Sequence, residues 1–436
     1  MVAKLVIRGG TPLRGTVNIS GAKNSALPII VASCLAEGES ILENIPRDID
    51  VYTISMILRE LGAEIWFDEA NRLHIIPDGL ERHQASYDLV RRMRASFYVA
   101  GLLLARLGKA EVPLSGGCAL GSRPVDYHLK GFQALGAKIN IEHGYVKAEA
   151  KELVGSKIYI NRSSVGTTMN LMLAATQAKG TTLLENAAKE PEIVDLAIYL
   201  NSMGARIRGA GTDVIRIDGV DSLKGTEYSI ISDRIEAGTF MVACGITGGD
   251  LLLGNVVPEH LRSTILKCSE AGLDIEEGPN EIRVRAKERP VAVDLETAPY
   301  PGFATDMQQP FVAMMAIAEG TSVIRETIFD RFRYVDELRR MGADIRVERD
   351  TAIIRGVGEL TGAPVEATDL RAGAALVLAA LVAKGETEIS GVELVDRGYE
   401  HLDQKLSQLG AQVERIHDQE DENQTEHLVP PLLERF

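Results

Sequence analysis

The chain has 436 residues, enough for two or three domains, and its 45% hydrophobic and 25% charged residues are typical of a soluble globular protein. The net charge of −15 argues against general binding to nucleic acid or to acidic membranes. No secretory signal is recognisable, and the longest apolar or glycine run of the C-terminal half, residues 372–383, is too short to span a bilayer.

Helices rich in small apolar residues alternate along the chain with β-like runs. In chain order, we predict an apolar helix at 25–36, a β-like run at 40–44, an apolar helix at 95–107, β-like runs at 157–160 and 181–186, an amphipathic helix at 194–205, a β-like run at 214–217, and an apolar helix at 372–383. Because these apolar helices are hydrophobic nearly all round, we expect them to be buried, with the sheets outside them.

Two series of glycines show that the chain repeats itself. One lies in turns related to LGA or MGA, at Gly62, Gly136, Gly204, Gly272, Gly342 and Gly410. The other, Gly38, Gly108, Gly180, Gly249, Gly320 and Gly385, is predicted to end the apolar helices. The shared period indicates six copies of a unit of about 70 residues. Six units are too many for one core, so we predict two domains of three units each.

The residues that start the six apolar helices are the next informative feature. Counting back 14 or 15 positions from the second glycine series leads to Lys23, Arg94, Val165, Arg234, Asp306 and Arg371. Helix N-termini attract anions through their free N–H groups and their partial positive charge. A single basic residue at a helix start is more often a surface charge beside an ordinary cap. Four basic residues in six copies favour an anion-binding cleft.

The loop LSGGCALGSRP, Leu114 to Pro124, holds Cys118 among three glycines. A lone cysteine is usually an inert thiol, but the flexible loop and the nearby Arg123 favour a reactive one. The remaining cysteines, Cys34, Cys244 and Cys268, form no CxxC pair, so neither a metal site nor a disulfide framework is indicated, and a reducing cytoplasm fits. P-loop and dinucleotide-binding fingerprints are absent from the sequence.

Nine motifs in one order carry a resemblance to a known family. They are SGAKNSALP, MRAS, LSGGCALGSRPVDYH, SVGTT, ENAAKEPEIVDLA, DRIEAGTF, TDMQ, TDLRA and DRGYE. Together they resemble the enolpyruvyl transferases, in particular the branch that acts on UDP-N-acetylglucosamine at the first committed step of peptidoglycan synthesis. The resemblance runs from about residue 5 to about residue 416.

The resemblance implies an α/β fold of two inside-out barrels with three repeats in each domain. The first domain is expected at residues 22–232 and carries the Cys118 loop. The second is expected to combine residues 1–21 with 233–420. Residues 421–436 form a polar and acidic extension, interpreted as disordered; docking of its LVPPLLERF end on a partner is the alternative.

The resemblance also implies roles for individual residues. Lys23 and Asn24 are expected to contact phosphoenolpyruvate, Arg123 and Arg397 to bind its phosphate, and Arg331 and Arg371 to lie at the same end of the cleft. The UDP-N-acetylglucosamine site is expected to contain Arg94, Arg123, Pro124, Val125, Asp126, Tyr127, Arg162, Ser163, Ser164, Val165, Asp306 and Ile328. Cys118 corresponds to the family's proton donor, which also forms a covalent adduct with phosphoenolpyruvate and is alkylated by fosfomycin.

The chemistry of enolpyruvyl transfer explains these residue types. A carboxylate, here Asp306, accepts the proton of the sugar hydroxyl that attacks C2 of phosphoenolpyruvate. The thiol of Cys118 protonates C3. Lys23 and the arginines stabilise the departing phosphate. The scheme requires neither a metal nor an organic cofactor. A shikimate 3-phosphate enzyme of the same fold and a non-catalytic UDP-sugar-binding regulator are the alternative functions.

Overall fold

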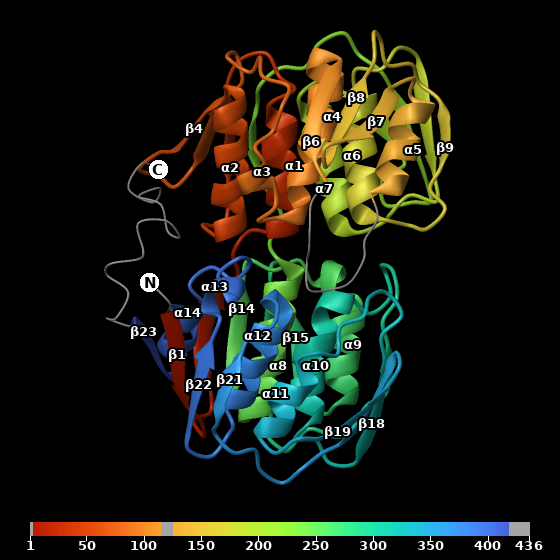
Figure 1. Ribbon diagram of the computed structural model, residues 1–436. Coiled ribbons are helices and arrows are strands. Elements are labelled where there is room, and N and C mark those ends of the chain that lie inside the picture. The colour runs from red at the N-terminus through yellow and green to blue at the C-terminus, as the bar shows by residue number, and fades with distance from the viewer. Residues whose placement is uncertain (1–2, 115–124, 418–436) are drawn as a thin grey trace. The chain divides into compact units, whose positions relative to one another are not determined.

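The computed structural model describes residues 3–114 and 125–417. The chain forms two compact units, which are described separately (Figure 1). The continuous unit is Gly21–Ile231, and the split unit combines Met1–Ser20 with Ser232–Phe436. The loop residues Cys118, Arg123 and Pro124 and the extension 421–436 lie outside the described residues.

The continuous unit alternates helices with short strands. Its helices are α1 (Lys23–Ser33), α2 (Ile49–Leu61), α3 (Tyr87–Val90), η1 (Arg94–Phe97), α4 (Tyr98–Leu107), α5 (Asp126–Ala134), α6 (Val165–Ala175) and α7 (Pro191–Ser202). Its strands are β3 (Ser40–Glu43), β4 (Glu64–Phe67), β5 (Leu73–Ile76), β6 (Lys109–Pro113), β7 (Lys138–Glu142), β8 (Tyr145–Glu149), β9 (Lys157–Tyr159), β10 (Thr181–Glu185), β11 (Arg206–Arg208), β12 (Val214–Asp218) and β13 (Glu227–Ser229). In its described part they form three sheets, ordered β13-β3-β5-β4, β6-β8-β7 and β11-β12-β10-β9.

The split unit repeats this plan. Its helices are α8 (Arg234–Thr247), η2 (Pro258–Leu261), α9 (Arg262–Glu270), η3 (Thr305–Met307), α10 (Gln308–Met315), α11 (Val335–Arg340), α12 (Leu370–Ala380), α13 (Val392–Val395) and α14 (Leu402–Gln408). Its strands are β1 (Ala3–Arg8), β2 (Arg14–Asn18), β14 (Asp250–Gly254), β15 (Asp274–Glu277), β16 (Glu281–Arg285), β17 (Leu295–Glu296), β18 (Thr321–Arg325), β19 (Asp344–Glu348), β20 (Thr351–Arg355), β21 (Pro364–Glu366), β22 (Glu386–Ser390) and β23 (Gln412–His417). Among the described residues, the sheets are β15-β16-β14-β2, β17-β18-β20-β19 and β21-β22-β1-β23.

Parallel pairing links neighbouring repeats, although at β6 it is only the single bridge between Gln84 and Glu111. In the split unit β17 pairs with β18 and β21 pairs with β22, both in parallel. The ring is completed by the N-terminal strands: β1 lies antiparallel between β22 and β23, and β2 pairs in parallel with β14. In the continuous unit β13 closes the ring by pairing in parallel with β3. The start of the chain is therefore built into the sheets of the split unit.

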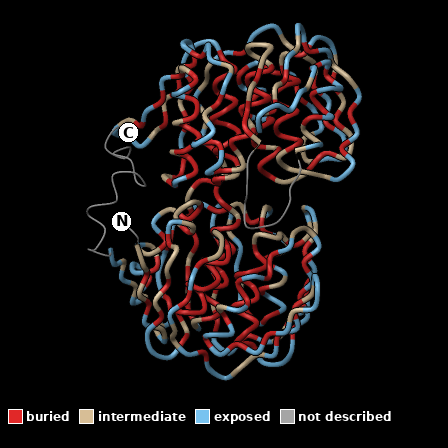
Figure 2. The backbone as a smooth tube through the Cα atoms, in the orientation of Figure 1, coloured by how far each residue is buried: buried red, intermediate tan, exposed pale blue. Residues whose placement is uncertain are grey.

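The predicted inside-out arrangement is confirmed, because the apolar helices are buried, as the red interior of each unit in Figure 2 shows. Every residue of α12 from Arg371 to Ala380 is buried, and α12 packs against α10 and α8. The outer faces of the strands are solvated: β20, for example, alternates buried Ala352 and Ile354 with exposed Ile353 and Arg355. Sheets exposed on one face and helices buried all round are the two patterns that the sequence predicts.

The glycine series mark helix ends only in part. Gly108 has a φ of 68° and caps α4 directly, and Gly62 caps α2 with a φ of 119°. The prediction that the second series ends every apolar helix is wrong for α1, α6, α10 and α12, which stop at Ser33, Ala175, Met315 and Ala380. The helix α8 is capped by Gly248, one residue before the glycine of the series. In α1 the reason is a tightened last turn. Three i→i+3 hydrogen bonds, from the amides of residues 34–36 to the carbonyls of residues 31–33, tighten the chain before Gly38 turns it, as often happens at helix C-termini.

Candidate active site

The six positions singled out by the repeats all lie in the first turn of a buried helix or of its lead-in. Lys23, Arg94, Val165 and Arg234 are the first residues of α1, η1, α6 and α8, Asp306 lies in η3 before α10, and Arg371 is the second residue of α12. Asp233 caps α8 and Asp369 caps α12 by accepting hydrogen bonds from backbone amides. In α8 and α12 the cap therefore lies one or two positions before the basic residue, and it leaves the basic side chain available for other contacts.

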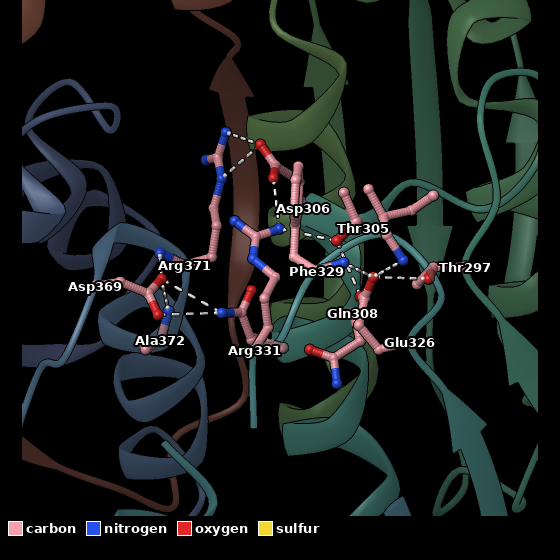
Figure 3. A network of polar contacts seen from close by, with 12 residues as sticks. Thr297, Thr305, Asp306, Gln308, Glu326, Phe329, Arg331, Asp369, Arg371 and Ala372 are labelled. Carbon is pink, nitrogen blue, oxygen red and sulfur yellow. Dashed lines mark hydrogen bonds and ion pairs between the residues drawn. The ribbon is translucent and has the colours of Figure 1, made fainter. Parts of the chain in front are cut away.

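In the split unit, Arg371 at the start of α12 and Arg331 in the loop after β18 both bind one carboxylate, Asp306 (Figure 3). Arg331 Nη1 donates a hydrogen bond of 2.7 Å to Asp306 Oδ1. Arg371 donates from Nε and Nη2 to Asp306 Oδ2, at 3.2 and 3.1 Å. The side chains of both arginines are at least 95% buried, whereas that of Asp306 is 25% exposed. The carboxylate is thus the part of this cluster that a substrate can reach.

Arg371 links the start of α12 to those of α8 and α10. Its guanidinium lies 5.1 Å above the ring of Tyr399, whose hydroxyl is 2.9 Å from Thr239 Oγ1 in α8. Burial opposes the charge of Arg371, but Tyr399, Asp306 and Asp233 favour it more strongly and raise its pKa. One guanidinium nitrogen of each arginine, Nη1 of Arg371 and Nε of Arg331, is buried without a hydrogen-bond partner in the described part of the chain. Such donors suit an anionic oxygen.

Glu326, buried at the end of β18, holds the loop that leads to Arg331. Its carboxylate accepts hydrogen bonds of 2.9 Å from both Thr297 and Thr305, and of 2.8 and 3.1 Å from the amides of Ile328 and Phe329. Thr305 also receives a hydrogen bond of 3.1 Å from Arg331 Nη1. Glu326 therefore fixes the backbone at Ile328 relative to the turn that carries Asp306.

In the continuous unit, Lys23 forms a buried ion pair. Its Nζ lies 3.1 Å from Oδ2 of Asp50, which stands in the first turn of α2. Only 10% of the Lys23 side chain and 3% of that of Asp50 are exposed. A buried ammonium needs such a partner to stay charged. Asn24 follows in α1 and is half-buried.

Many of the residues expected to bind the nucleotide sugar lie at two helix starts of the same unit. Val125 caps α5, and Asp126 and Tyr127 are its first residues. Ser164 caps α6 through a hydrogen bond from the Thr167 amide, directly after exposed Arg162 and half-buried Ser163. A depression of about 170 Å³ beside them is lined by Tyr127, Lys130, Gly131, Ala134, residues 157–160 and Asn161. It is smaller than pockets that enclose a whole ligand.

His128, next in α5, is held neutral. Its Nδ1 lies 3.0 Å from Nδ2 of Asn170, which also donates to the carbonyl of Phe97. Because the amide nitrogen can only donate, Nδ1 accepts and the ring proton resides on Nε2. Burial, with a smaller effect of Arg94, lowers the pKa of His128 to about 3. His128 is therefore a structural residue rather than an acid–base group near neutral pH, as its isolated place in the sequence suggests.

The three described cysteines are unsuited to proton transfer. Cys34, Cys244 and Cys268 are free and buried, and burial raises the pKa of each thiol to about 12. No group of three or more histidine, cysteine, aspartate or glutamate side chains within residues 3–114 and 125–417 has the arrangement of a metal site. In the same ranges, no helix has the length and apolar character needed to cross a membrane.

The structure thus brings together Asp306, Arg331 and Arg371, and it pairs Lys23 with a residue that the motifs did not indicate. Arg397 lies between α13 and Tyr399 and is half-buried. The sequence did not indicate Asp50 or Glu326 as site residues, because each stands in a segment without a distinctive pattern. Tyr399 was present in the DRGYE motif, but nothing in the sequence indicated that its ring packs on Arg371.

The sequence of this chain is similar to those of known proteins. The sequence model of the EPSP synthase (3-phosphoshikimate 1-carboxyvinyltransferase) family matches residues 7–406. A UDP-N-acetylglucosamine 1-carboxyvinyltransferase 2 of Symbiobacterium thermophilum is 56% identical over 419 residues, covering 95% of this chain and 99% of that protein. A UDP-N-acetylglucosamine 1-carboxyvinyltransferase of Thermodesulfovibrio yellowstonii is 55% identical, covering 95% and 99%.

Solved structures show the same fold. The enolpyruvyl transferase NikO from Streptomyces tendae superposes with a TM-score of 0.86 at 25% identity, covering 95% of this chain and 99% of that one. EPSP synthase from Acinetobacter baumannii has a TM-score of 0.73 at 21% identity, covering 96% of this chain and all of that one.

Proposed function

The chain belongs to the EPSP synthase family of enolpyruvyl transferases, and we propose that it works as a UDP-N-acetylglucosamine 1-carboxyvinyltransferase. Five curated relatives with 51–56% identity over about 95% of the chain bear that name, and their agreement carries the proposal. The enzyme transfers the enolpyruvyl group of phosphoenolpyruvate to the 3′-hydroxyl of UDP-N-acetylglucosamine and releases phosphate, which commits the sugar to peptidoglycan synthesis.

The first step adds the sugar hydroxyl to C2 of phosphoenolpyruvate. Asp306 accepts the hydroxyl proton, because its carboxylate is the partly exposed group of a buried cluster. Arg331 and Arg371 orient that carboxylate and balance its charge. Cys118 protonates C3, so that a tetrahedral intermediate forms with phosphate still attached to C2. This role rests on the motif, since Cys118 lies outside the described residues.

The second step eliminates phosphate. The C2–O bond to phosphate breaks while C3 loses a proton, and the double bond forms again in the product. Cations are needed around the leaving group, and Lys23, Arg123 and Arg397 supply them. Asp50 keeps the buried ammonium of Lys23 charged and in place. Asn24 contacts phosphoenolpyruvate beside Lys23.

The nucleotide sugar binds at the starts of α5 and α6. Residues 123–127 and 162–165, with Arg94, contact UDP-N-acetylglucosamine, and Asp306 and Ile328 face its reacting end. Glu326 supports this arrangement by fixing the amide of Ile328. Both substrates are phosphorylated metabolites of the cytoplasm, which is where we place the enzyme; the buried free thiols agree with a reducing compartment.

Phosphate release with defined substrate pairs tests this function. We expect release only when UDP-N-acetylglucosamine and phosphoenolpyruvate are both present. Release with shikimate 3-phosphate in place of the nucleotide sugar would assign the chain to the other branch of the family. Binding of UDP-N-acetylglucosamine without any release would identify a non-catalytic regulator.

A further inference from the structure

A buried cluster in the split unit has no part in the reaction described above. Lys405 Nζ in α14 donates hydrogen bonds of 2.6 Å to Oε1 of Glu236 and of 2.7 Å to Oγ of Ser20. The Ser20 amide donates to the second oxygen of Glu236, at 2.7 Å. The hydroxyl of Ser20 in turn donates to Glu400. Only 2% of the Glu236 side chain and 14% of that of Lys405 are exposed.

The cluster holds the last residue of the N-terminal segment. Ser20 is where that segment leaves the split unit, and its carbonyl accepts a hydrogen bond of 2.8 Å from the amide of Asp233, just after the chain returns. Burying a lysine and a glutamate costs free energy that an apolar pair would avoid. A buried ion pair is therefore not explained by stability alone. We infer that it holds neighbouring residues in place.

That target is the segment Asp396–Glu400, which contains Arg397. At one end, Arg415 binds Asp396 with two hydrogen bonds of 2.8 and 2.9 Å. At the other end, Glu400 accepts from Ser20. Between them, the ring of Tyr399 packs against Arg371 and its hydroxyl contacts Thr239. The segment is thus held at Asp396, Tyr399 and Glu400. Arg397 lies between the first two of these contacts.

We propose that Glu236 and Lys405 are positioning residues for phosphoenolpyruvate, acting through Ser20 and Glu400 on the segment that carries Arg397. This role rests on the proposed function, in which Arg397 binds the phosphate of phosphoenolpyruvate. The hydroxyl of Ser20 connects Lys405 to Glu400, because its oxygen accepts a hydrogen bond from Lys405 and its O–H donates one to Glu400. Loss of that connection removes the contact by which Ser20 holds Glu400, the residue at the end of this segment.

Ser20→Ala is the sharpest test, because it removes this connection and leaves the Glu236–Lys405 ion pair in place. From the sensitivity of catalysis to small displacements, we expect the KM for phosphoenolpyruvate to rise about 5- to 10-fold and the KM for UDP-N-acetylglucosamine to stay within about twofold. Lys405→Met should raise the KM for phosphoenolpyruvate at least as much. Lys405→Arg, which keeps the positive charge, should have a KM close to that of the wild type. Lys384→Met is the control, since Lys384 forms an ion pair with Glu359 in the same unit and its side chain is 75% exposed.

The outcomes separate the two proposals. Absence of phosphate release by the wild type overturns the proposed function and, with it, this role. With an active wild type, unchanged kinetics of Ser20→Ala, or an equal rise of both KM values, overturns the positioning role alone. Should Lys405→Met fail to fold, Ser20→Ala still decides the question, because it buries no unpaired charge.

Discussion

Oδ2 of Asp306 lies 3.1 Å from Nη2 of Arg371, so the turn before α10 is joined to the first turn of α12 by a nearly buried ion pair. The two residues are 65 positions apart, about one repeat of the sequence. Asp306 and Arg371 thus stand at equivalent positions of neighbouring repeats, carry opposite charges and form an ion pair. The result is a carboxylate that is held by two arginines and remains partly exposed.

Asp306→Asn should lower kcat/KM by about 10²- to 10⁴-fold, because an amide cannot accept the hydroxyl proton. It also removes the carboxylate that both buried guanidinium groups bind, so the melting temperature should fall as well. Steady-state phosphate release on the folded fraction separates the two effects. Asp336→Asn is the control, since Asp336 pairs with Arg339 at 2.7 Å but its side chain is 77% exposed. More than a tenth of wild-type activity in Asp306→Asn would contradict its role as proton acceptor.

Fosfomycin should add once to the native protein, at Cys118. The thiols of Cys34, Cys244 and Cys268 are buried, with pKa values raised to about 12, and the thiolate is the reactive form. Intact-mass measurement with saturating UDP-N-acetylglucosamine checks the stoichiometry, and Cys118→Asp should give no adduct. Cys118→Asp should also keep more phosphate release than Cys118→Ala if proton donation is the main role. Equal loss in both would indicate a role that only a thiol can fill.

Stability should decrease below pH 6.5 in a way that depends on His128. Its pKa is about 3 in the folded protein and near 6.5 when exposed, so the unfolded chain binds the extra proton between these values. The stability contributed by the neutral ring is complete above pH 6.5 and is lost as the pH falls, by at most about 1.4 kcal/mol per pH unit. His128→Asn keeps an acceptor for Asn170 but does not titrate. Its urea midpoint should therefore change less between pH 6.5 and 4.5 than that of the wild type; parallel curves would refute the assignment.

Arg106→Met should destabilise the continuous unit by about 2–4 kcal/mol, because hydrogen bonds to a charged donor are strong and their acceptors would stay buried. Arg106 donates to the carbonyls of Cys34 and Ala36 after α1, both at 3.0 Å, and to that of Pro77 at 3.1 Å. Thermal unfolding followed by circular dichroism measures the effect. Arg91→Met, which removes an exposed arginine paired with Asp88 at 3.5 Å, should leave the transition unchanged. An equal shift in the two variants would show that the three carbonyl contacts contribute little.

Much of the architecture follows from the sequence. The six-fold glycine period, the apolar helices and the β-like runs between them lead to repeats with buried helices, because each pattern depends only on residues near one another in the chain. The same register located the helix starts at which Lys23, Arg94, Asp306 and Arg371 stand. That Asp306 and Arg371 meet could not be predicted from this register, since the packing of helices from different repeats is a tertiary property.

The sequence by itself determined the repeat, the residues at each helix start and the family motifs. Only the tertiary structure decided which charges meet: Asp306 with Arg331 and Arg371, Lys23 with Asp50, and Glu236 with Lys405 and Ser20. These partners are 25–216 residues apart in the chain, so no local pattern of the sequence predicts their pairing. A charge in a sequence has no preferred partner until burial removes water, and folding alone determines which groups are buried together.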